Sequence, residues 1–187
     1  LSSAPPSGEN EAVIVPLQKD AWATVISNPA LVVGSGTEDA VRYTLLPVLK
    51  ARSVRPCGML SWGNGKAERA GEKELEKEYP GIRNWGAEPG ECPVRQWRLR
   101  PGNALVLEDF PVPLRTGIRQ DRNRVLSWEC RGRRFLMIGN TGFSSLARAE
   151  KTPRADVLLI GHHPRDPVDS AAWIRATGAR AVIFTTE

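Results

Sequence analysis

A short apolar run, closed by a glycine and followed by two histidines, limits how this chain can fold more than any other stretch. Residues 157–160 read Val-Leu-Leu-Ile, and Gly161, His162 and His163 come next. A run this short before a glycine predicts a buried strand rather than a helix. In an open α/β sheet, ligands bind beyond the carboxyl ends of strands, so the only two histidines of the chain lie where a metal or catalytic site is expected.

The rest of the chain divides into two strand-rich halves, each ending in alternating helices and strands. Apolar alternation and turn residues predict strands at 12–17, 21–27, 31–33, 57–61, 94–99, 104–107, 125–130, 135–138 and 181–184. Helical spacing predicts helices at 39–52, 68–79, 143–150 and 170–177. Pro47 within the first of them predicts a kink or a helix start nearer that residue. This order predicts an α/β fold with two sheets packed face to face and helices outside, a four-layer αββα sandwich.

Domain organisation follows from length and composition. Residues 1–11 are polar and rich in Pro and Ser, which predicts a disordered linker, and residues 12–187 are expected to form a single domain. No G-x-S-x-G elbow is present, and the glycine-rich residues 34–39 lack the P-loop lysine. Trp22, Trp97 and Trp128 fall in predicted strands and are expected in the core, as is Cys57 as a small apolar residue.

Arginine is concentrated in one part of the chain. Ten arginines and no lysine lie between Glu91 and Phe135, against five acidic residues, in a chain of net charge +5. Arginine is well suited to bidentate contact with phosphate, so this segment is a candidate anion-binding face. A solvated surface of strand ends and loop tips is the alternative.

The order and spacing of these segments resemble the metallo-β-lactamase-like domain of ComEC-type DNA-uptake proteins, from about Ala12 to Phe184. The family's D-V-G-Q-G-D-A turn is similar to VPLQKDA here, where Gln18, Asp20 and Ala21 match. Its L-I-D-T-G is similar to LVVGS at 31–35, its G-H-H-G-S to GHHPR at 161–165, and its final A-V-I-S to AVIF at 181–184. The resemblance implies a metallo-β-lactamase-like fold.

The same resemblance implies that most metal ligands have been replaced. The family's T/S-H-x-H/D-x-D-H stretch corresponds to Ser61 onward, with Trp62, Asn64, Lys66 and Ala67 at the four ligand positions. The later T-G-D, whose Asp bridges metals in the family, is similar to residues 138–140, which end in Asn140. The vestigial site expected here comprises Asp20, Trp62, Asn64, Lys66, Asn140, His162 and His163.

Coordination chemistry leads to the same expectation without the family. A catalytic zinc site needs about three ligands from His, Cys or carboxylate. Adjacent side chains of an extended segment point to opposite faces, so His162 and His163 are not expected to hold one ion together. We therefore expect no metal and no other cofactor. The resemblance further implies that Lys66 and Trp62 fill the former metal cavity, where the buried ammonium needs a partner and Asp20 is the carboxylate that the family would place nearby. Asp20, Glu68 and Asp166 remain as possible carboxylate ligands.

The resemblance finally implies a function and a location. We expect a non-catalytic domain of a membrane channel for DNA uptake in transformation, on the outer face of the cytoplasmic membrane, with a structural or DNA-handling role. Its expected partners are the membrane-embedded remainder of the same polypeptide and DNA, bound weakly and without sequence preference. The expected DNA-binding residues are Arg122, Arg124, Arg131, Arg133 and Arg134. A metal-dependent hydrolase or nuclease with rearranged ligands and a protein-interaction module are the alternatives.

Overall fold

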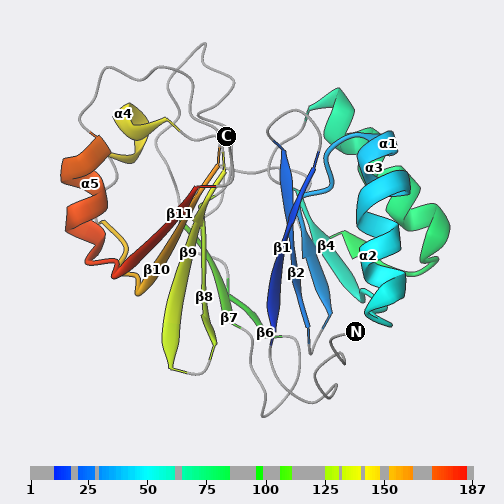
Figure 1. Ribbon diagram of the computed structural model, residues 1–187, viewed down its shortest axis with the longest axis horizontal. Helices are drawn as coiled ribbons and strands as arrows, with labels where there is room; N and C mark the ends of the chain where they lie inside the picture. Colours follow the sequence, from blue (N-terminus) through cyan, green and yellow to red (C-terminus); the bar gives the residue numbers. More distant parts are fainter. Residues whose placement is uncertain are drawn as a thin grey trace. The chain divides into compact units, whose positions relative to one another are not determined.

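The structure is a computed structural model in which two compact units, Leu1–Ala87 and Glu88–Glu187, each contain one sheet and its helices (Figure 1). It describes residues 11–17, 21–27, 30–61, 65–84, 96–98, 106–110, 125–130, 132–139, 142–147, 152–161 and 170–184. Within these ranges no helix is long and apolar enough to cross a membrane.

The sheet of the first unit has five strands in the order β1-β2-β3-β4-β5. The strands are β1 (Ala12–Pro16), β2 (Trp22–Ile26), β3 (Leu31–Val33), β4 (Gly58–Leu60) and β5 (Arg83–Asn84). The strands β1, β2 and β3 pair antiparallel, whereas β3, β4 and β5 run parallel. The change to parallel pairing requires a crossover connection, and a helical segment supplies it between β3 and β4.

The crossover is a continuous helical stretch of α1 (Glu38–Ala40), the π-helical turn η1 (Val41–Leu45) and α2 (Leu46–Ala51). The predicted kink at Pro47 corresponds to this π-helical turn. Proline has no backbone N–H and its ring crowds the carbonyl four residues earlier. The turn directly before Pro47 widens, and the Leu46 N–H bonds the Val41 carbonyl five residues back.

Helix α3 (Lys66–Glu78) covers the same face of the sheet as α2 (Figure 1). It is a charged helix with Gly71 and Leu75 as its buried residues, as its Glu/Lys pattern predicts. Leu75 packs into one core cluster with residues of the crossover helices and of the sheet, namely Val15, Ala23, Val25, Val32, Val41, Leu45, Leu46, Leu49 and Met59. This apolar layer is what holds the two helices on the sheet.

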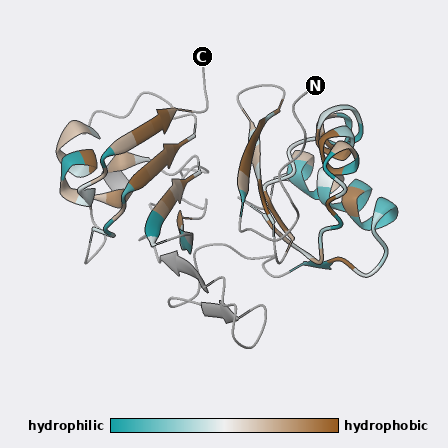
Figure 2. Cartoon of the chain, turned by 60° about the horizontal axis from the view of Figure 1, so that its bottom comes forward, coloured by the Kyte–Doolittle hydropathy of each residue, from teal (hydrophilic) through white to brown (hydrophobic). Residues whose placement is uncertain are grey.

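The sheet of the second unit has six strands in the order β11-β10-β9-β8-β7-β6. The strands are β6 (Gln96–Arg98), β7 (Val106–Phe110), β8 (Val125–Cys130), β9 (Arg133–Ile138), β10 (Val157–Ile160) and β11 (Ala181–Phe184). The strands β6 to β9 are antiparallel, and β9, β10 and β11 are parallel. Figure 2 shows that the coloured strands of both sheets are mainly hydrophobic.

Helices α4 (Phe143–Leu146) and α5 (Ser170–Thr177) lie together beside this sheet (Figure 1). Phe143 and Trp173 meet edge to face, with ring centroids 5.9 Å apart, in one cluster with Leu136, Leu158 and Ile160. Edge-to-face aromatic pairs add about 0.5–1.5 kcal/mol beyond their buried area. The pair therefore joins the two helices to each other over the parallel part of the sheet.

Most predicted elements agree with the structure within a few residues, and the exceptions are informative. The strand β5 was not predicted, and the helix expected at 143–150 is described only as Phe143–Leu146. Trp22 and Trp128 are buried as expected. The structure describes Trp97 only as a strand residue, so its expected burial stays a prediction. The expectation that Cys57 is a core residue is wrong, because it is exposed just before β4, where its thiol donates to the Ala30 carbonyl over 3.2 Å.

Candidate functional site

In the first unit, the two parallel strands β3 and β4 end at the same edge of the sheet. Val33 pairs with Leu60, and the Gly34 N–H donates to the Leu60 carbonyl over 2.8 Å. The chain then leaves β3 through Gly34, Ser35 and Gly36, and leaves β4 through Ser61. Gly34 and Gly36 have φ values of 80° and 68°, a region that favours glycine, so the tight turn depends on them.

Helix α3 packs directly on this turn. The Ser35 hydroxyl donates to the Glu68 carbonyl over 3.1 Å. A Cβ added to Gly71 would lie 2.5 Å from the Gly36 carbonyl oxygen, so the backbones approach as closely as a glycine permits. The first two turns of α3 are therefore fixed against the carboxyl end of β3, at the edge where the sequence predicts a site.

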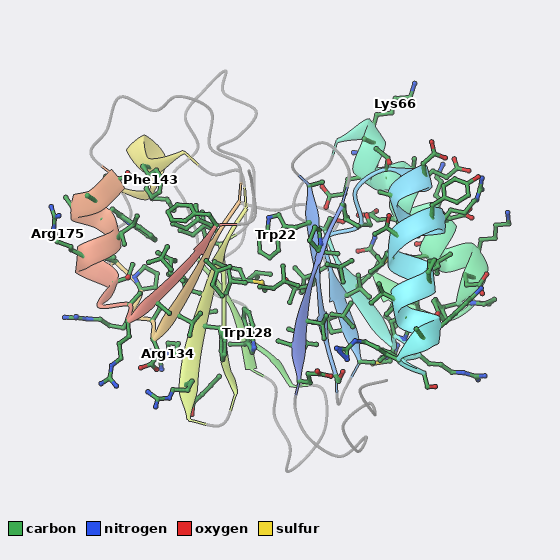
Figure 3. All side chains as sticks on the ribbon, viewed as in Figure 1. Trp22, Lys66, Trp128, Arg134, Phe143 and Arg175 are labelled. Atoms are coloured by element: carbon green, nitrogen blue, oxygen red, sulfur yellow. The ribbon has the colours of Figure 1, made fainter. Side chains whose placement is uncertain are left out.

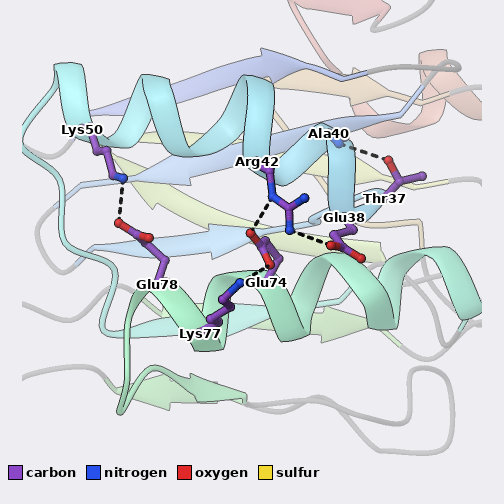
Figure 4. A network of polar contacts seen from close by, with 8 residues as sticks. All are labelled: Thr37, Glu38, Ala40, Arg42, Lys50, Glu74, Lys77 and Glu78. Atoms are coloured by element: carbon purple, nitrogen blue, oxygen red, sulfur yellow. Dashed lines mark hydrogen bonds and ion pairs between the residues drawn. The ribbon is translucent and has the colours of Figure 1, made fainter.

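A network of ion pairs ties the crossover helix to α3 (Figure 4). Arg42 donates from Nε to Glu74 Oε1 over 3.0 Å and from Nη2 to Glu38 Oε1 over 2.7 Å. Lys50 Nζ lies 2.7 Å from Glu78 Oε1. The hydrogen bond from Arg42 holds the pKa of the Glu74 carboxyl below its ordinary value. These contacts join the crossover helix to α3, and we assign them a structural role.

Among the described side chains at this edge, Ser61 is the one with a buried polar group that has no hydrogen-bond partner. Its residue is 2% exposed, and its hydroxyl has no hydrogen-bond partner among the residues that the structure describes. A buried hydroxyl without a partner is unfavourable by about 1–3 kcal/mol. Ser61 directly precedes residues 62–64, which include two of the predicted site positions.

Lys66 differs from its prediction. It is the first residue of α3, its side chain is exposed, and Figure 3 shows it pointing away from the sheet. The expectation of a buried Lys66 ammonium is therefore wrong, and its expected partner Asp20 lies outside the described residues. A cation at a helix N-terminus is disfavoured by the helix dipole, so exposure to solvent stabilises it. Asp20, Trp62, Asn64, Asn140, His162 and His163 lie outside the described residues.

In the second unit, the parallel strands β9 and β10 also end together. Ile138 pairs with Ile160, and the Gly161 N–H donates to the Ile138 carbonyl over 3.0 Å. Asn140 and His162 each come two residues after these paired ends. The prediction of a strand at 157–160, with the histidines at its carboxyl end, is confirmed. The segments that lead to Asn140 and His162 therefore leave this sheet at the same edge.

Comparisons with known proteins were made at the level of sequence and of structure. No protein-family model matches the chain, and no curated protein matches it by sequence. Many solved structures are similar to it, among them the following three. A Cronobacter sakazakii metallo-β-lactamase with a HARLDQ motif has a TM-score of 0.58 at 11% identity, over 76% of this chain and 71% of that one. The ETHE1 protein from Myxococcus xanthus has a TM-score of 0.56 at 14% identity, over 90% and 82%. The MIM-1 metallo-β-lactamase from Novosphingobium pentaromativorans has a TM-score of 0.53 at 13% identity, over 95% and 93%.

The chain has the metallo-β-lactamase fold. The predicted fold class is therefore confirmed, and identities this low say nothing about activity. Within the described residues, no group of three or more His, Cys, Asp or Glu could hold a metal ion. At the four positions that the resemblance aligns with ligands, the side chains are Trp62, Asn64, Lys66 and Ala67. Only the neutral amide of Asn64 has an atom that coordinates metals, and it does so weakly.

The predicted arginine face is described in part. Arg133 and Arg134 are exposed at the start of β9, whereas Arg122, Arg124 and Arg131 lie outside the described residues. Arg133 Nη1 lies 3.7 Å from Asp156 Oδ1, and the Arg134 N–H donates to Asp156 Oδ2 over 2.9 Å. The backbone hydrogen bond from Arg134, followed by the charges of Arg133, Arg180 and Arg134, holds the pKa of Asp156 below its ordinary value.

Proposed function

We propose that this chain is the metallo-β-lactamase-fold domain of a ComEC-type DNA-uptake protein, and that it is a non-catalytic module that handles DNA. The fold of the chain and the order of its short motifs both support this assignment. The observation that carries the non-catalytic part is the composition of the segment between β4 and α3. Residues 61–65 read Ser-Trp-Gly-Asn-Gly and contain no His, Cys, Asp or Glu.

The metal that the fold implies does not fit the donors present at this edge. A catalytic zinc ion needs about three ligands and an open position. The segment after β4 supplies none of the usual ligand types, and Lys66 directs a positive charge into solvent at the start of α3. We therefore derive no reaction step through a metal ion. The domain is instead proposed to act through its surface.

The surface chemistry supports binding to DNA rather than cleavage. Ten arginines between Glu91 and Phe135 outnumber the acidic residues two to one, and arginine forms bidentate contacts with phosphate. We propose weak, sequence-independent binding, in a domain joined to the membrane-embedded remainder of the same polypeptide on the outer face of the cytoplasmic membrane. In this role the domain would hold DNA near the channel.

The test of DNA binding is fluorescence anisotropy with a labelled single-stranded oligonucleotide at several salt concentrations. If three to five phosphates are engaged, log Kd against log salt should have a slope of magnitude about 2 to 3.5. Reversal of Arg131, Arg133 and Arg134 to Glu should weaken binding to all sequences alike and flatten this dependence. Absence of binding at low salt would contradict the proposal and favour a protein-interaction module.

The non-catalytic part is tested separately with unlabelled single- and double-stranded DNA in the presence of Zn²⁺ or Mn²⁺. We expect no cleavage above that of a reaction containing EDTA. Cleavage that disappears both with EDTA and in a His163→Ala variant would contradict the proposal and favour a nuclease with rearranged ligands. The His163→Ala variant distinguishes cleavage by this chain from a contaminating nuclease.

A further inference from the structure

The amino ends of the three parallel strands of the second unit carry a cluster of arginines, which we call the arginine rim. It consists of Arg133 and Arg134 at the start of β9, Arg154 before β10 and Arg180 before β11. Val157 pairs with both Phe135 and Ala181, so residues 134, 156 and 180 precede paired positions on adjacent strands. The rim is thus at the opposite edge of the sheet from the segments that lead to Asn140 and His162.

One residue, Asp156, joins the starts of the three strands through its backbone and its carboxylate. The Asp156 N–H donates to the Arg134 carbonyl over 2.8 Å, and the Arg134 N–H returns a bond of 2.9 Å to Asp156 Oδ2. The Arg180 N–H donates to the Asp156 carbonyl over 2.9 Å. Arg133 Nη1 lies 3.7 Å from the other carboxylate oxygen. The strand starts are therefore fixed relative to each other, and the arginine side chains project from a rigid base.

A hollow of about 290 Å³ opens at this rim. Arg134, Arg154 and Asp156 line it together with Glu129, Gly132, Ala155, Thr177 and Gly178. Arg154 Nη1 lies 3.2 Å from where a Cβ on Gly178 would be, and Gly178 has a φ of 72°. The absence of a side chain at Gly178 thus leaves room for the Arg154 guanidinium beside the hollow. Figure 3 shows Arg134 at this end of β9 and Arg175 on the neighbouring helix α5.

The rim carries more positive charge than its own carboxylates neutralise. Four guanidinium groups meet the two carboxylates of Asp156 and Glu129, which leaves a net charge of +2. Within the described part of the chain, neither Arg154 nor Arg180 has a carboxylate within ion-pair distance, and both are exposed, although the charge of Arg180 helps to lower the pKa of Asp156. A rigid base with two guanidinium groups outside ion pairs is suited to bind an anion with several negative charges.

We propose that the arginine rim binds the phosphate backbone of a nucleic acid. This inference deepens the proposed function, on which it rests, by naming Arg154 and Arg180 as contact residues that the arginine-rich segment at 91–135 does not include. Three adjacent strand starts span about 10 Å at about 4.8 Å per strand. That length corresponds to about three steps of 3.4 Å along the axis of one duplex strand, the distance spanned by about four successive phosphates.

A nucleic acid fits the rim better than a membrane surface. Binding to anionic lipid is strengthened by apolar side chains that enter the bilayer beside the cations. The rim has no exposed large hydrophobic residue among those described, and Ile183 and Phe184, which are exposed, lie at the other end of β11. Arginine rather than lysine supplies every described cation of this unit, which favours directed contact with phosphate.

The test compares a rim variant, Arg154→Glu/Arg180→Glu, with a control variant, Arg69→Glu/Arg83→Glu, by anisotropy with a single-stranded oligonucleotide. Arg69 and Arg83 are exposed residues of the first unit. Both variants replace two arginines with two glutamates, so they change the net charge equally. Two lost phosphate contacts should reduce the magnitude of the log–log salt slope by about 1.4 in the rim variant, while the control keeps the wild-type slope. An Arg154→Gln/Arg180→Gln variant should show the same reduction, and circular dichroism checks that each variant is folded.

The outcomes separate this inference from the proposed function. If the wild-type chain binds DNA and the triple reversal at 131, 133 and 134 weakens binding, but both rim variants bind like the control, Arg154 and Arg180 are not contact residues; the inference is then overturned and the proposed function stands. If the wild-type chain does not bind DNA, both fail. Vesicles containing phosphatidylserine are the second probe: binding to them that is lost in the rim variants, without binding to DNA, would assign the rim to a membrane and overturn the inference.

Discussion

Substitution of Gly71 by alanine tests how closely α3 packs on the turn after β3. In an exposed helix interior, Gly→Ala stabilises a protein by about 1 kcal/mol. At Gly71 the new Cβ would lie 2.5 Å from the Gly36 carbonyl oxygen and 3.1 Å from both Ser35 Oγ and Val41 Cγ2. Overpacking of a close-packed site costs about 1–3 kcal/mol. Because the closest atom is backbone and cannot rotate away, the upper end of that range applies, and we expect net destabilisation of about 2 kcal/mol.

The assay is urea unfolding of the full chain followed by circular dichroism. Gly71→Ala should lower the midpoint concentration at an unchanged slope, since the loss is in the folded state. Lys73→Ala on the exposed side of the same helix is the matched control, and its effect should stay within about 0.5 kcal/mol.

A Gly71→Ala variant that is as stable as the wild-type chain, or more so, would refute the reasoning. Helix propensity would then dominate, and α3 could not approach the Gly34–Gly36 turn as closely as the structure has it. The positions of the strand-edge residues that follow from this packing would have to be revised.

Two further predictions concern the polar groups of the first unit. The folded-state pKa of Glu74 is held below its ordinary 4.5, so the pair with Arg42 contributes stability above pH 4.5, and this stability is lost as the pH falls through the lowered pKa. Glu74→Gln should therefore reduce the stability of the chain at pH 7 and weaken the decline of stability with acid in pH-dependent thermal melts. Glu76→Gln on the exposed side of the same helix should do neither. Ser61→Ala should raise the free energy of unfolding by about 1 kcal/mol, because it removes a buried hydroxyl that lacks a described partner, while Ser35→Ala should lower it by about 1 kcal/mol because a hydrogen bond is lost. A cost above about 1 kcal/mol for Ser61→Ala in chemical denaturation would show that its hydroxyl is hydrogen-bonded.

The fold could be predicted from the sequence where the signal is local. The strands β8, β10 and β11 and helix α5 agree with prediction residue for residue, because each is a short apolar run or an amphipathic repeat bounded by turn residues. The strand β5 was not predicted, because Arg83–Asn84 is short, polar and exposed, and it is a strand through its pairing with β4. The π-helical turn before Pro47 has no sequence pattern beyond the proline itself.

Contacts between distant segments could not be predicted in the same way. Gly71 gives no sequence sign that it lies against Gly36, and Arg154 and Arg180 lie outside the arginine-rich segment that the composition singles out. Arg154 lies near Arg134 because both line one hollow, and strand register places Arg180 on the other side of Asp156 from Arg134. Lys66 was expected in a cavity because of its aligned position, but it is exposed because it begins a helix. The chemical identity of the candidate site, in contrast, comes from the sequence, since Trp62, Asn64 and Asn140 lie outside the described residues.

Metal content tests most directly the central proposal, that this domain of metallo-β-lactamase fold has no metal centre. The chain is purified with Zn²⁺ and Mn²⁺ present, desalted and analysed by plasma mass spectrometry, with a His163→Ala variant prepared in parallel. The donors present predict a metal-to-protein ratio near zero that is the same in both preparations. A ratio of about one or two ions per chain in the wild-type protein, lost in the His163→Ala variant, would contradict the claim and assign a metal-dependent activity to the domain.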